Sequence, residues 1–185
     1  MKTKNVLVLV LIIIAGLLNV KELKAVGPTE SATLNLNIVL NPIQTITVTA
    51  TQKSVDLIYK TEDNYESGVS VKQNDHLKIF STGGFTVSVE SDGNLSNGEG
   101  KVIESTDVTI LAENGTGNEV LNTTTGAVAL GSEKTLITSD SGGRDLMYNV
   151  TYNNKTGIKD KYINLYKNNG VNTFTATVTY TIAAK

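Results

Sequence analysis

The feature that most constrains the fold is an unbroken alternation of apolar and polar residues near the end of the chain. From Thr173 to Ile182, every second residue is apolar and the residues between them are all Thr. A period of two places successive side chains on opposite faces of a β-strand. The stretch therefore predicts a C-terminal strand with one face in a core and the other in solvent. Its core-facing residues are Phe174, Ala176, Val178, Tyr180 and Ile182.

A second alternation of the same period lies near the start of the chain. Between residues 32 and 40 the even positions are apolar, and mostly Asn or Thr lies between them. Pro42 follows, and because proline cannot donate to a strand ladder it marks an edge or a bend. We expect one strand before Pro42 and another from Thr45 to Ala50. The apolar positions of the first strand are Ala32, Leu34, Leu36, Ile38 and Leu40.

Between these two ends, short β-branched and aromatic runs alternate with Gly, Asn, Asp and Ser. That pattern is typical of an all-β chain with tight turns, and two packed antiparallel sheets are the expected architecture. Helix is expected only as a turn around residues 61–68. The other expected strands are Ser54–Lys60, Leu77–Ser81, Phe85–Glu90, Val102–Leu111, Ala127–Leu130, Thr135–Thr138, Leu146–Tyr152 and Tyr162–Tyr166.

The first 25 residues have the features of a signal peptide. Lys2 and Lys4 precede an apolar run from Val6 to Leu18, and Ala25 is the expected last residue of the leader. The run of about 13 residues is shorter than the ~20 that a spanning helix needs, although an uncleaved anchor is the alternative. We therefore expect an exported protein with a signal peptide at 1–25, an extension at 26–42 and one domain at 43–185.

Charge and cysteine content narrow the classes of partner. Without the leader the chain has 12 basic and 17 acidic residues, a balance that argues against nucleic acid and anionic membranes. The sequence contains no Cys, so neither a disulfide nor a thiolate-ligated metal is available. We expect no cofactor.

One motif and the single histidine could carry chemistry, and each has a simpler interpretation. Ser141 lies in "SDSGG", which looks like the nucleophile motif of a protease, but the only His is His76 and it lacks that family's context. A Gly-Gly turn is the simpler interpretation, and His76 is expected at the surface or a strand end. We therefore expect no catalytic residues and no enzyme activity.

Two further groups could bind a ligand. The loop "SDGNLSNGEG" places four oxygen-bearing side chains close together, as calcium sites do, but it lacks the spacing of the twelve-residue calcium loop, and a solvated turn is the expected state. Four tyrosines could form a sugar-stacking platform or simply fill the core. These residues are Asp92, Asn94, Asn97 and Glu99 in the loop, and Tyr148, Tyr152, Tyr162 and Tyr166 in the platform.

Both ends of the chain resemble subunits of chaperone-usher pili, in particular the cysteine-free colonisation-factor type. The resemblance is carried by the alternating extension after the leader, by the closing strand with Tyr180, and by Gly170 ahead of it. "TITVTA" followed by "SVDLI" is also similar to the opening of colonisation-factor major pilins. The resemblance implies an immunoglobulin-like sandwich that lacks one strand, with other pilus subunits, a periplasmic chaperone and an outer-membrane usher as partners.

The function expected from this resemblance is that of a structural subunit of a surface fimbria. Ala32–Leu40 would be the donor strand that inserts beside Phe174–Ile182 of a neighbouring subunit, supporting adhesion or biofilm formation. The alternative for this segment is that it forms the first strand of its own sandwich. The alternative function is that of a secreted, monomeric carbohydrate-binding or adhesin sandwich domain.

Overall fold

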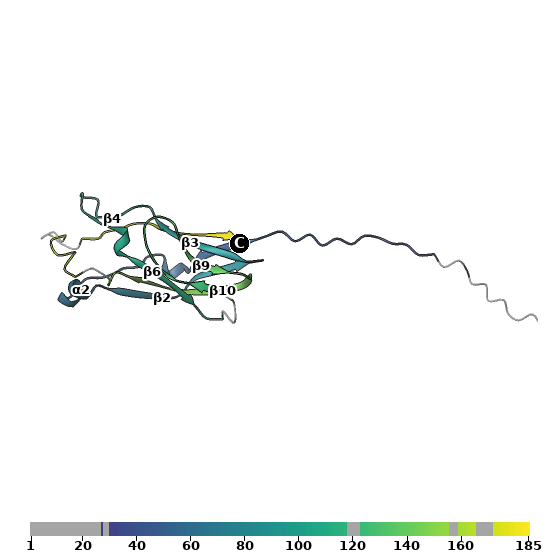
Figure 1. Cartoon of the computed structure of the whole chain (residues 1–185), viewed down its shortest axis with the longest axis horizontal. Coiled ribbons are helices and arrows are strands. Elements are labelled where there is room, and N and C mark those ends of the chain that lie inside the picture. The colour runs from purple at the N-terminus through teal and green to yellow at the C-terminus, as the bar shows by residue number, and fades with distance from the viewer. Residues whose placement is uncertain (1–26, 28–29, 118–122, 156–158, 166–171) are drawn as a thin grey trace, which may run out of the picture. The chain divides into compact units, whose positions relative to one another are not determined.

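The computed structural model describes residues 27, 30–117, 123–155, 159–165 and 172–185 of the chain (Figure 1). The chain divides into two units, Met1–Val39 and Leu40–Lys185. The second unit contains every described helix and strand. The predicted leader and Gly170 lie outside the described residues. No described helix has the length and apolar character that a membrane span requires.

The larger sheet of the second unit has five strands in the order β1-β2-β10-β6-β8, with every neighbouring pair antiparallel. The longest strands, β2 and β10, pair with each other at its centre. The strands of this sheet are β1 (Gln44–Val48), β2 (Ser70–Ser81), β6 (Thr109–Asn114), β8 (Ala127–Ala129) and β10 (Gly143–Asn153).

The smaller main sheet has four strands in the order β11-β3-β9-β7, also antiparallel throughout. A two-stranded ribbon and three short helices complete the described elements. These strands are β3 (Phe85–Ser91), β7 (Thr123–Thr125), β9 (Lys134–Ser139), β11 (Val178–Ala184), β4 (Leu95–Ser96) and β5 (Val102–Ile103). The helices are η1 (Ala50–Gln52), α2 (Glu62–Ser67) and η2 (Ser105–Asp107).

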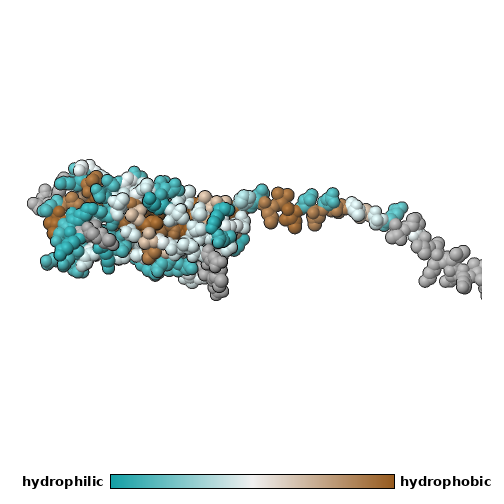
Figure 2. Space-filling model, viewed as in Figure 1, coloured by the Kyte–Doolittle hydropathy of each residue, from teal (hydrophilic) through white to brown (hydrophobic). Residues whose placement is uncertain are grey.

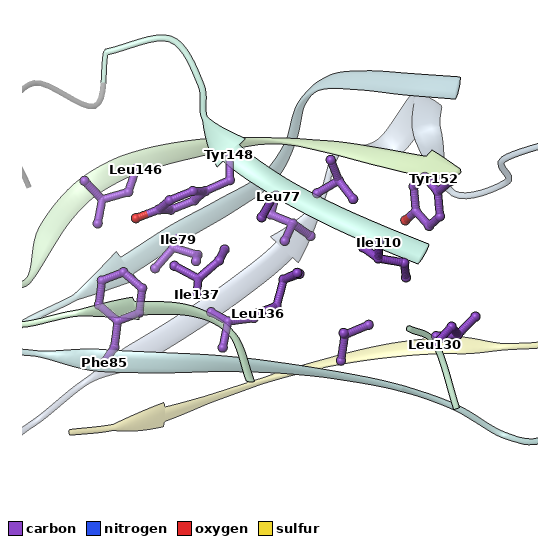
Figure 3. Packing of buried hydrophobic residues seen from close by; sticks show 14 of the residues in the cluster. Leu77, Ile79, Phe85, Ile110, Leu130, Leu136, Ile137, Leu146, Tyr148 and Tyr152 are labelled. Carbon is purple, nitrogen blue, oxygen red and sulfur yellow. The ribbon is translucent and has the colours of Figure 1, made fainter. Parts of the chain in front are cut away.

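The core lies between the inner faces of the two main sheets (Figure 3). Leu77 and Ile79 from β2 and Tyr148 from β10 project from one sheet, and Phe85 of β3 and Ile137 of β9 project from the other; all are fully buried. The alternation predicted for these strands therefore separates core from surface, and the predicted all-β antiparallel sandwich is confirmed.

The short helix was also predicted correctly. Thr61 caps α2, because its hydroxyl accepts a hydrogen bond from Asn64 N at 3.3 Å while the Asn64 side chain accepts one from Thr61 N at 3.2 Å. Such reciprocal capping satisfies two backbone donors that would otherwise lack partners in the first turn. The helix ends at Gly68, whose φ of 75° suits glycine.

Several strand predictions were wrong in whole or in part. The segment before Pro42 has no regular secondary structure, and the C-terminal strand begins at Val178 and not at Thr173. Ser54–Lys60 alternates between exposed and partly buried residues but pairs with no described strand. One-sided packing is enough to produce such an alternation without a ladder. Val102–Leu111 is broken by η2 into β5 and β6. Tyr162–Leu165 forms turns, and Tyr166 lies outside the described residues.

Candidate functional site: the open edge of β11

The C-terminal strand lies at the edge of its sheet. β11 pairs with β3 in continuous register from Val178↔Ser91 to Ala184↔Phe85, and in the described part of the chain no strand pairs with its other side. An edge strand with unpaired backbone groups is a template for strand addition. The outer edge of β11 is therefore the candidate functional site, and we call it the open edge.

Hydrogen bonds at both ends of the β11–β3 pair show which backbone groups face outward. Asp92 N donates to Thr177 O, and Lys185 N donates to Gly84 O, both at 3.0 Å. In an antiparallel pair the hydrogen-bonded residues alternate with residues that turn their N–H and C=O groups away. The odd residues of β11 thus bond to β3. The even residues, including Tyr180 and Ile182, direct their backbone groups toward the open edge.

The same even residues turn their side chains toward the core. Val178, Tyr180 and Ile182 pack against the core cluster but are only partly buried. The predicted row is also partly buried at Phe174 and Ala176, while every Thr between them is exposed. β11 itself begins later than predicted, at Val178. Before it, Thr175 forms an isolated bridge with Ser96, so the row is continuous although the strand assignment is not.

A second row of partly buried apolar residues belongs to the facing sheet. Ile46 and Val48 of β1, and Val55 and Leu57 after η1, pack against the core without becoming fully buried. β1 is the edge strand of the five-stranded sheet and approaches β11 closely without pairing with it. The sandwich is thus incompletely covered along the side where β1 and β11 meet.

The predicted donor segment belongs to residues 30–42, for which the structure has no regular secondary structure and every described side chain is exposed. Leu34, Leu36, Ile38 and Leu40 are 82%, 83%, 81% and 87% exposed. Figure 2 shows the hydrophobic colour gathered along this extended segment. Ala32 is exposed as well. A run of large apolar side chains at this exposure is unusual for a soluble protein and is typical of a segment that binds something.

A hydrogen-bonded chain of polar side chains lies beneath the open edge. Tyr180 OH is 2.7 Å from Tyr152 OH, and Tyr152 OH is 2.8 Å from His76 Nε2. His76 Nδ1 is 2.9 Å from Gln52 Oε1. These hydrogen-bonded side chains connect β11 with β10, β2 and η1, so they join the two sheets on the incompletely covered side.

The direction of each hydrogen bond in this chain follows from its far end. Gln52 Nε2 donates to Asn74 O at 3.0 Å, so Gln52 Oε1 faces His76 as an acceptor and His76 Nδ1 carries the proton. The Nε2 atom of a neutral imidazole then accepts from Tyr152, and Tyr152 accepts in turn from Tyr180. Burial lowers the pKa of His76, which favours this neutral form.

His76 was expected at the surface or a strand end, and that expectation was wrong, since the side chain is 2% exposed. The reason is a bulge in β2: Asp75 has a φ of 49° and the pairing with β10 shifts register between Tyr148 and Val150. The bulge places His76 and Leu77, which are consecutive, both in the interior. A simple period of two cannot reveal such a position.

The alternative sites from the sequence have structural explanations. Ser141 is exposed in a turn where Ser139 Oγ donates to Ser141 O at 2.8 Å, and both nitrogens of His76 bond to Gln52 and Tyr152. His76 therefore does not act as the base for Ser141. This agrees with the interpretation of "SDSGG" as a turn.

Oxygens of the candidate calcium loop bond within the protein. Asp92 Oδ1 accepts from Thr177 N at 2.8 Å, Asn94 Oδ1 accepts from Ser105 N, and Asn97 Oδ1 accepts from Glu99 N. Among the described residues no group of three or more His, Cys, Asp or Glu could hold a metal ion. The loop is built as a hydrogen-bonded turn.

Three of the four tyrosines proposed for a sugar platform are not on the surface, and Tyr166 lies outside the described residues. Tyr148, Tyr152 and Tyr162 are all buried, so these rings cannot stack on a sugar in solution. An open pocket of about 320 Å³ does lie between α2 and the turns that follow β10. It is lined by Glu62, Tyr65, Asp160, Tyr162, Ile163 and Asn164.

Comparison with known proteins adds no family to this picture. No protein-family model matches the sequence, and the search of curated proteins found no match either.

Proposed function

We propose that the chain is the structural subunit of a surface fibre, in which residues 32–40 of one copy add a strand to the open edge of β11 in the next copy. The observation that carries this proposal is that one chain contains both an unpaired, partly covered strand edge and a separate exposed apolar segment. β-Strand addition of this kind supplies affinity through main-chain hydrogen bonds and specificity through alternate side chains.

The two partners match in length and period. Ala32–Leu40 and Phe174–Ile182 each contain nine residues with five apolar positions at a spacing of two. Nine extended residues span about 30 Å. A strand of that length can follow the whole row and place its apolar side chains over the partly buried core residues beneath.

The residues just after the donor segment favour a neighbouring copy over the chain's own edge. Ile43 is held in line with β1, because Thr82 N donates to Ile43 O at 3.0 Å and Ile43 N donates to Thr82 Oγ1 at 2.9 Å. A return onto the same sandwich would need a tight reversal at Asn41–Pro42. Two-residue hairpin loops favour positive φ, whereas proline has a fixed negative φ and restricts the residue before it to extended conformations.

Burial of the donor segment supplies enough free energy for a stable contact. The four large side chains, Leu34, Leu36, Ile38 and Leu40, at about 1.5 to 3 kcal/mol each contribute roughly 6 to 12 kcal/mol before the costs of association and ordering, and Ala32 adds less. Insertion also has to move β1 away from β11, which reduces the net gain. Because donor and acceptor are different surfaces, repeated addition is head to tail and generates an open filament.

The wider setting of the proposal comes from the sequence. The signal-peptide pattern at residues 1–25 indicates export, and the resemblance to chaperone-usher pilins suggests an immunoglobulin-like topology, a periplasmic chaperone and an outer-membrane usher. Adhesion or biofilm formation is the expected role of such a fibre. Those partners are part of the proposal, and strand addition does not depend on them.

The test compares two charge variants of the full chain. Leu36→Asp with Ile38→Asp places carboxylates on the face that would be buried, whereas Asn35→Asp with Asn37→Asp adds the same charge to the opposite face of the strand. We expect the native chain and the second variant to form fibres in electron micrographs and SDS-resistant ladders. The first variant should remain a folded monomer.

Two results would contradict the proposal. A native chain that stays monomeric at all concentrations has no intermolecular strand addition. Unfolding of the Leu36→Asp, Ile38→Asp variant, measured by circular dichroism, would show instead that the segment is the first strand of its own sandwich.

A further inference from the structure

The acceptor edge is connected by hydrogen bonds to a buried histidine, a group that titrates near neutral pH. His76 is the only histidine in the chain, and Tyr152 and Tyr180 connect its ring to β11. His76 also makes edge-to-face contacts with both phenol rings, at centroid distances of 5.7 Å to Tyr152 and 6.2 Å to Tyr180. A change in the charge of this ring therefore acts directly on the strand that would accept a partner.

The groups packed against the ring provide no negative charge. Gln52 comes from η1, Tyr152 from β10 and Tyr180 from β11. Burial raises the pKa of both phenols, so they stay neutral wherever histidine titrates. The neighbouring carboxylate of Asp75 is engaged by Thr116, whose N and Oγ1 donate to it at 2.8 Å. Among the described residues, an imidazolium at this position would lack an ionic partner.

A count of the protons shows what protonation of His76 does to the hydrogen bonds among Gln52, His76, Tyr152 and Tyr180. With neutral His76 the three donors each have an acceptor: Nδ1–H bonds to Gln52, Tyr152 O–H to Nε2, and Tyr180 O–H to the Tyr152 oxygen. Protonated Nε2 becomes a donor and turns toward the Tyr152 oxygen, so Tyr152 donates to Tyr180 instead. The hydroxyl proton of Tyr180 then has no acceptor within the chain of residues.

We propose that the protonation state of His76 controls strand addition at β11. The neutral ring directs the Tyr180 proton inward and leaves an apolar surface for an incoming strand. The imidazolium leaves that proton without an acceptor among these residues, so it depends on water that a covering strand would exclude. Strand addition is therefore favoured near neutral pH and weakened in acid. This inference rests on the proposed function, since it concerns the same edge.

If protonation of His76 weakens strand binding, strand binding must in turn lower the pKa of His76. A strand that covers β11 removes water from the open side of the hydrogen-bonded network, which disfavours the charged ring further. Occupancy of the edge must then lower the pKa of His76 by the amount that protonation weakens binding. The change in binding affinity with pH and the change in the pKa of His76 on binding can be measured independently, and they must agree.

The experiment uses the full chain with Leu36→Asp and Ile38→Asp, so that its own segment does not compete, and a fluorescent synthetic peptide of residues 31–41. Anisotropy gives the peptide affinity at about pH 5 and about pH 8, which bracket the histidine range. We expect affinity about tenfold weaker in acid. NMR titration of the single histidine should show a lower pKa when the peptide is bound.

Matched tyrosine variants locate the effect. Tyr180→Phe keeps the ring and removes the hydroxyl proton that lacks an acceptor in acid, so peptide affinity should become nearly independent of pH. Tyr148→Phe removes a buried hydroxyl from β10 outside the chain of hydrogen bonds, and the acid weakening should persist.

The outcomes separate this inference from the proposed function. Binding with the same affinity at both pH values and an unchanged pKa of His76 overturns the inference and leaves strand addition standing. Retention of the full pH effect in Tyr180→Phe also overturns it. Absence of peptide binding at every pH overturns both.

Discussion

Strands β3 and β11 are neighbours in one sheet and have the same alternating pattern, yet their inward side chains differ in burial. Phe85, Val87 and Val89 of β3 are 0%, 0% and 1% exposed. Val178, Tyr180 and Ile182 of β11 are only partly buried, although Ile182 is directly opposite Val87 in the register. The difference follows from position, because among the described strands β3 has a neighbour on each side and β11 has one.

The comparison separates two properties that a sequence pattern merges. Alternation determines which face of a strand is apolar, while the number of neighbouring strands determines how completely that face is covered. The exposed segment at residues 32–40 has the alternation with no described neighbour at all. Three degrees of coverage thus occur in one chain, and in the proposed fibre the uncovered segment of one copy binds the partly covered edge of the next.

The largest effect is expected where coverage is complete. Phe85→Ala removes a fully buried ring from β3 and should lower the free energy of unfolding by about 3 to 5 kcal/mol, since the cavity cannot collapse fully. Urea denaturation of the unassembled chain provides the measurement. A loss below about 1 kcal/mol would mean that the core beside β3 is not tightly packed.

A pH effect of intermediate size should come from His76. Burial lowers its pKa in the folded chain, so the unfolded chain binds the proton more readily. Stability should therefore fall as the pH drops below the unfolded value of about 6.5, and by about 1.4 kcal/mol for each unit of pKa difference. The control is His76→Gln in the same series of denaturation curves. An equally steep acid loss in that variant would assign the effect to other groups.

A smaller effect is expected at the edge itself. Ile182→Ala should cost the unassembled chain about 1 to 2 kcal/mol, less than the ~2 to 5 kcal/mol typical of full burial. The same substitution should cost more once a peptide of residues 31–41 covers β11. Equal losses with and without the peptide would contradict the assignment of this row to the acceptor site.

The smallest effect is expected on the outer face of β11. Thr181→Ala alters an exposed side chain and should change the free energy of unfolding by no more than about 0.5 kcal/mol. Fibre formation should persist, which electron microscopy can verify. Loss of fibres in this variant would mean that the incoming copy contacts the exposed Thr face of β11, which contradicts the proposed contact.

Periodicity predicted the fold class and most strands because antiparallel sheets with one solvated face record their burial in the sequence. It also predicted the apolar row of β11 residue by residue. It did not reveal the bulge at Asp75, and hence missed the burial of His76. It could not distinguish Ser54–Lys60, which packs on one side without a ladder, from a paired strand.

The polar part of the candidate site could not be predicted from the sequence for a similar reason. Gln52, His76, Tyr152 and Tyr180 come from four separate elements. No local pattern connects them, and only the packing of two sheets brings them together. The open edge itself is a property of topology, since the sequence of β11 resembles that of a fully paired strand.

The most direct test of the account is amide hydrogen exchange along β11, comparing native fibres with the unassembled Leu36→Asp, Ile38→Asp chain. In the unassembled chain, Thr179 and Thr181 should exchange slowly because their amides bond to β3, while Tyr180 and Ile182 should exchange quickly. In fibres all four should be slow. Slow exchange of Tyr180 and Ile182 before assembly, or fast exchange in fibres, would contradict addition of a strand at this edge.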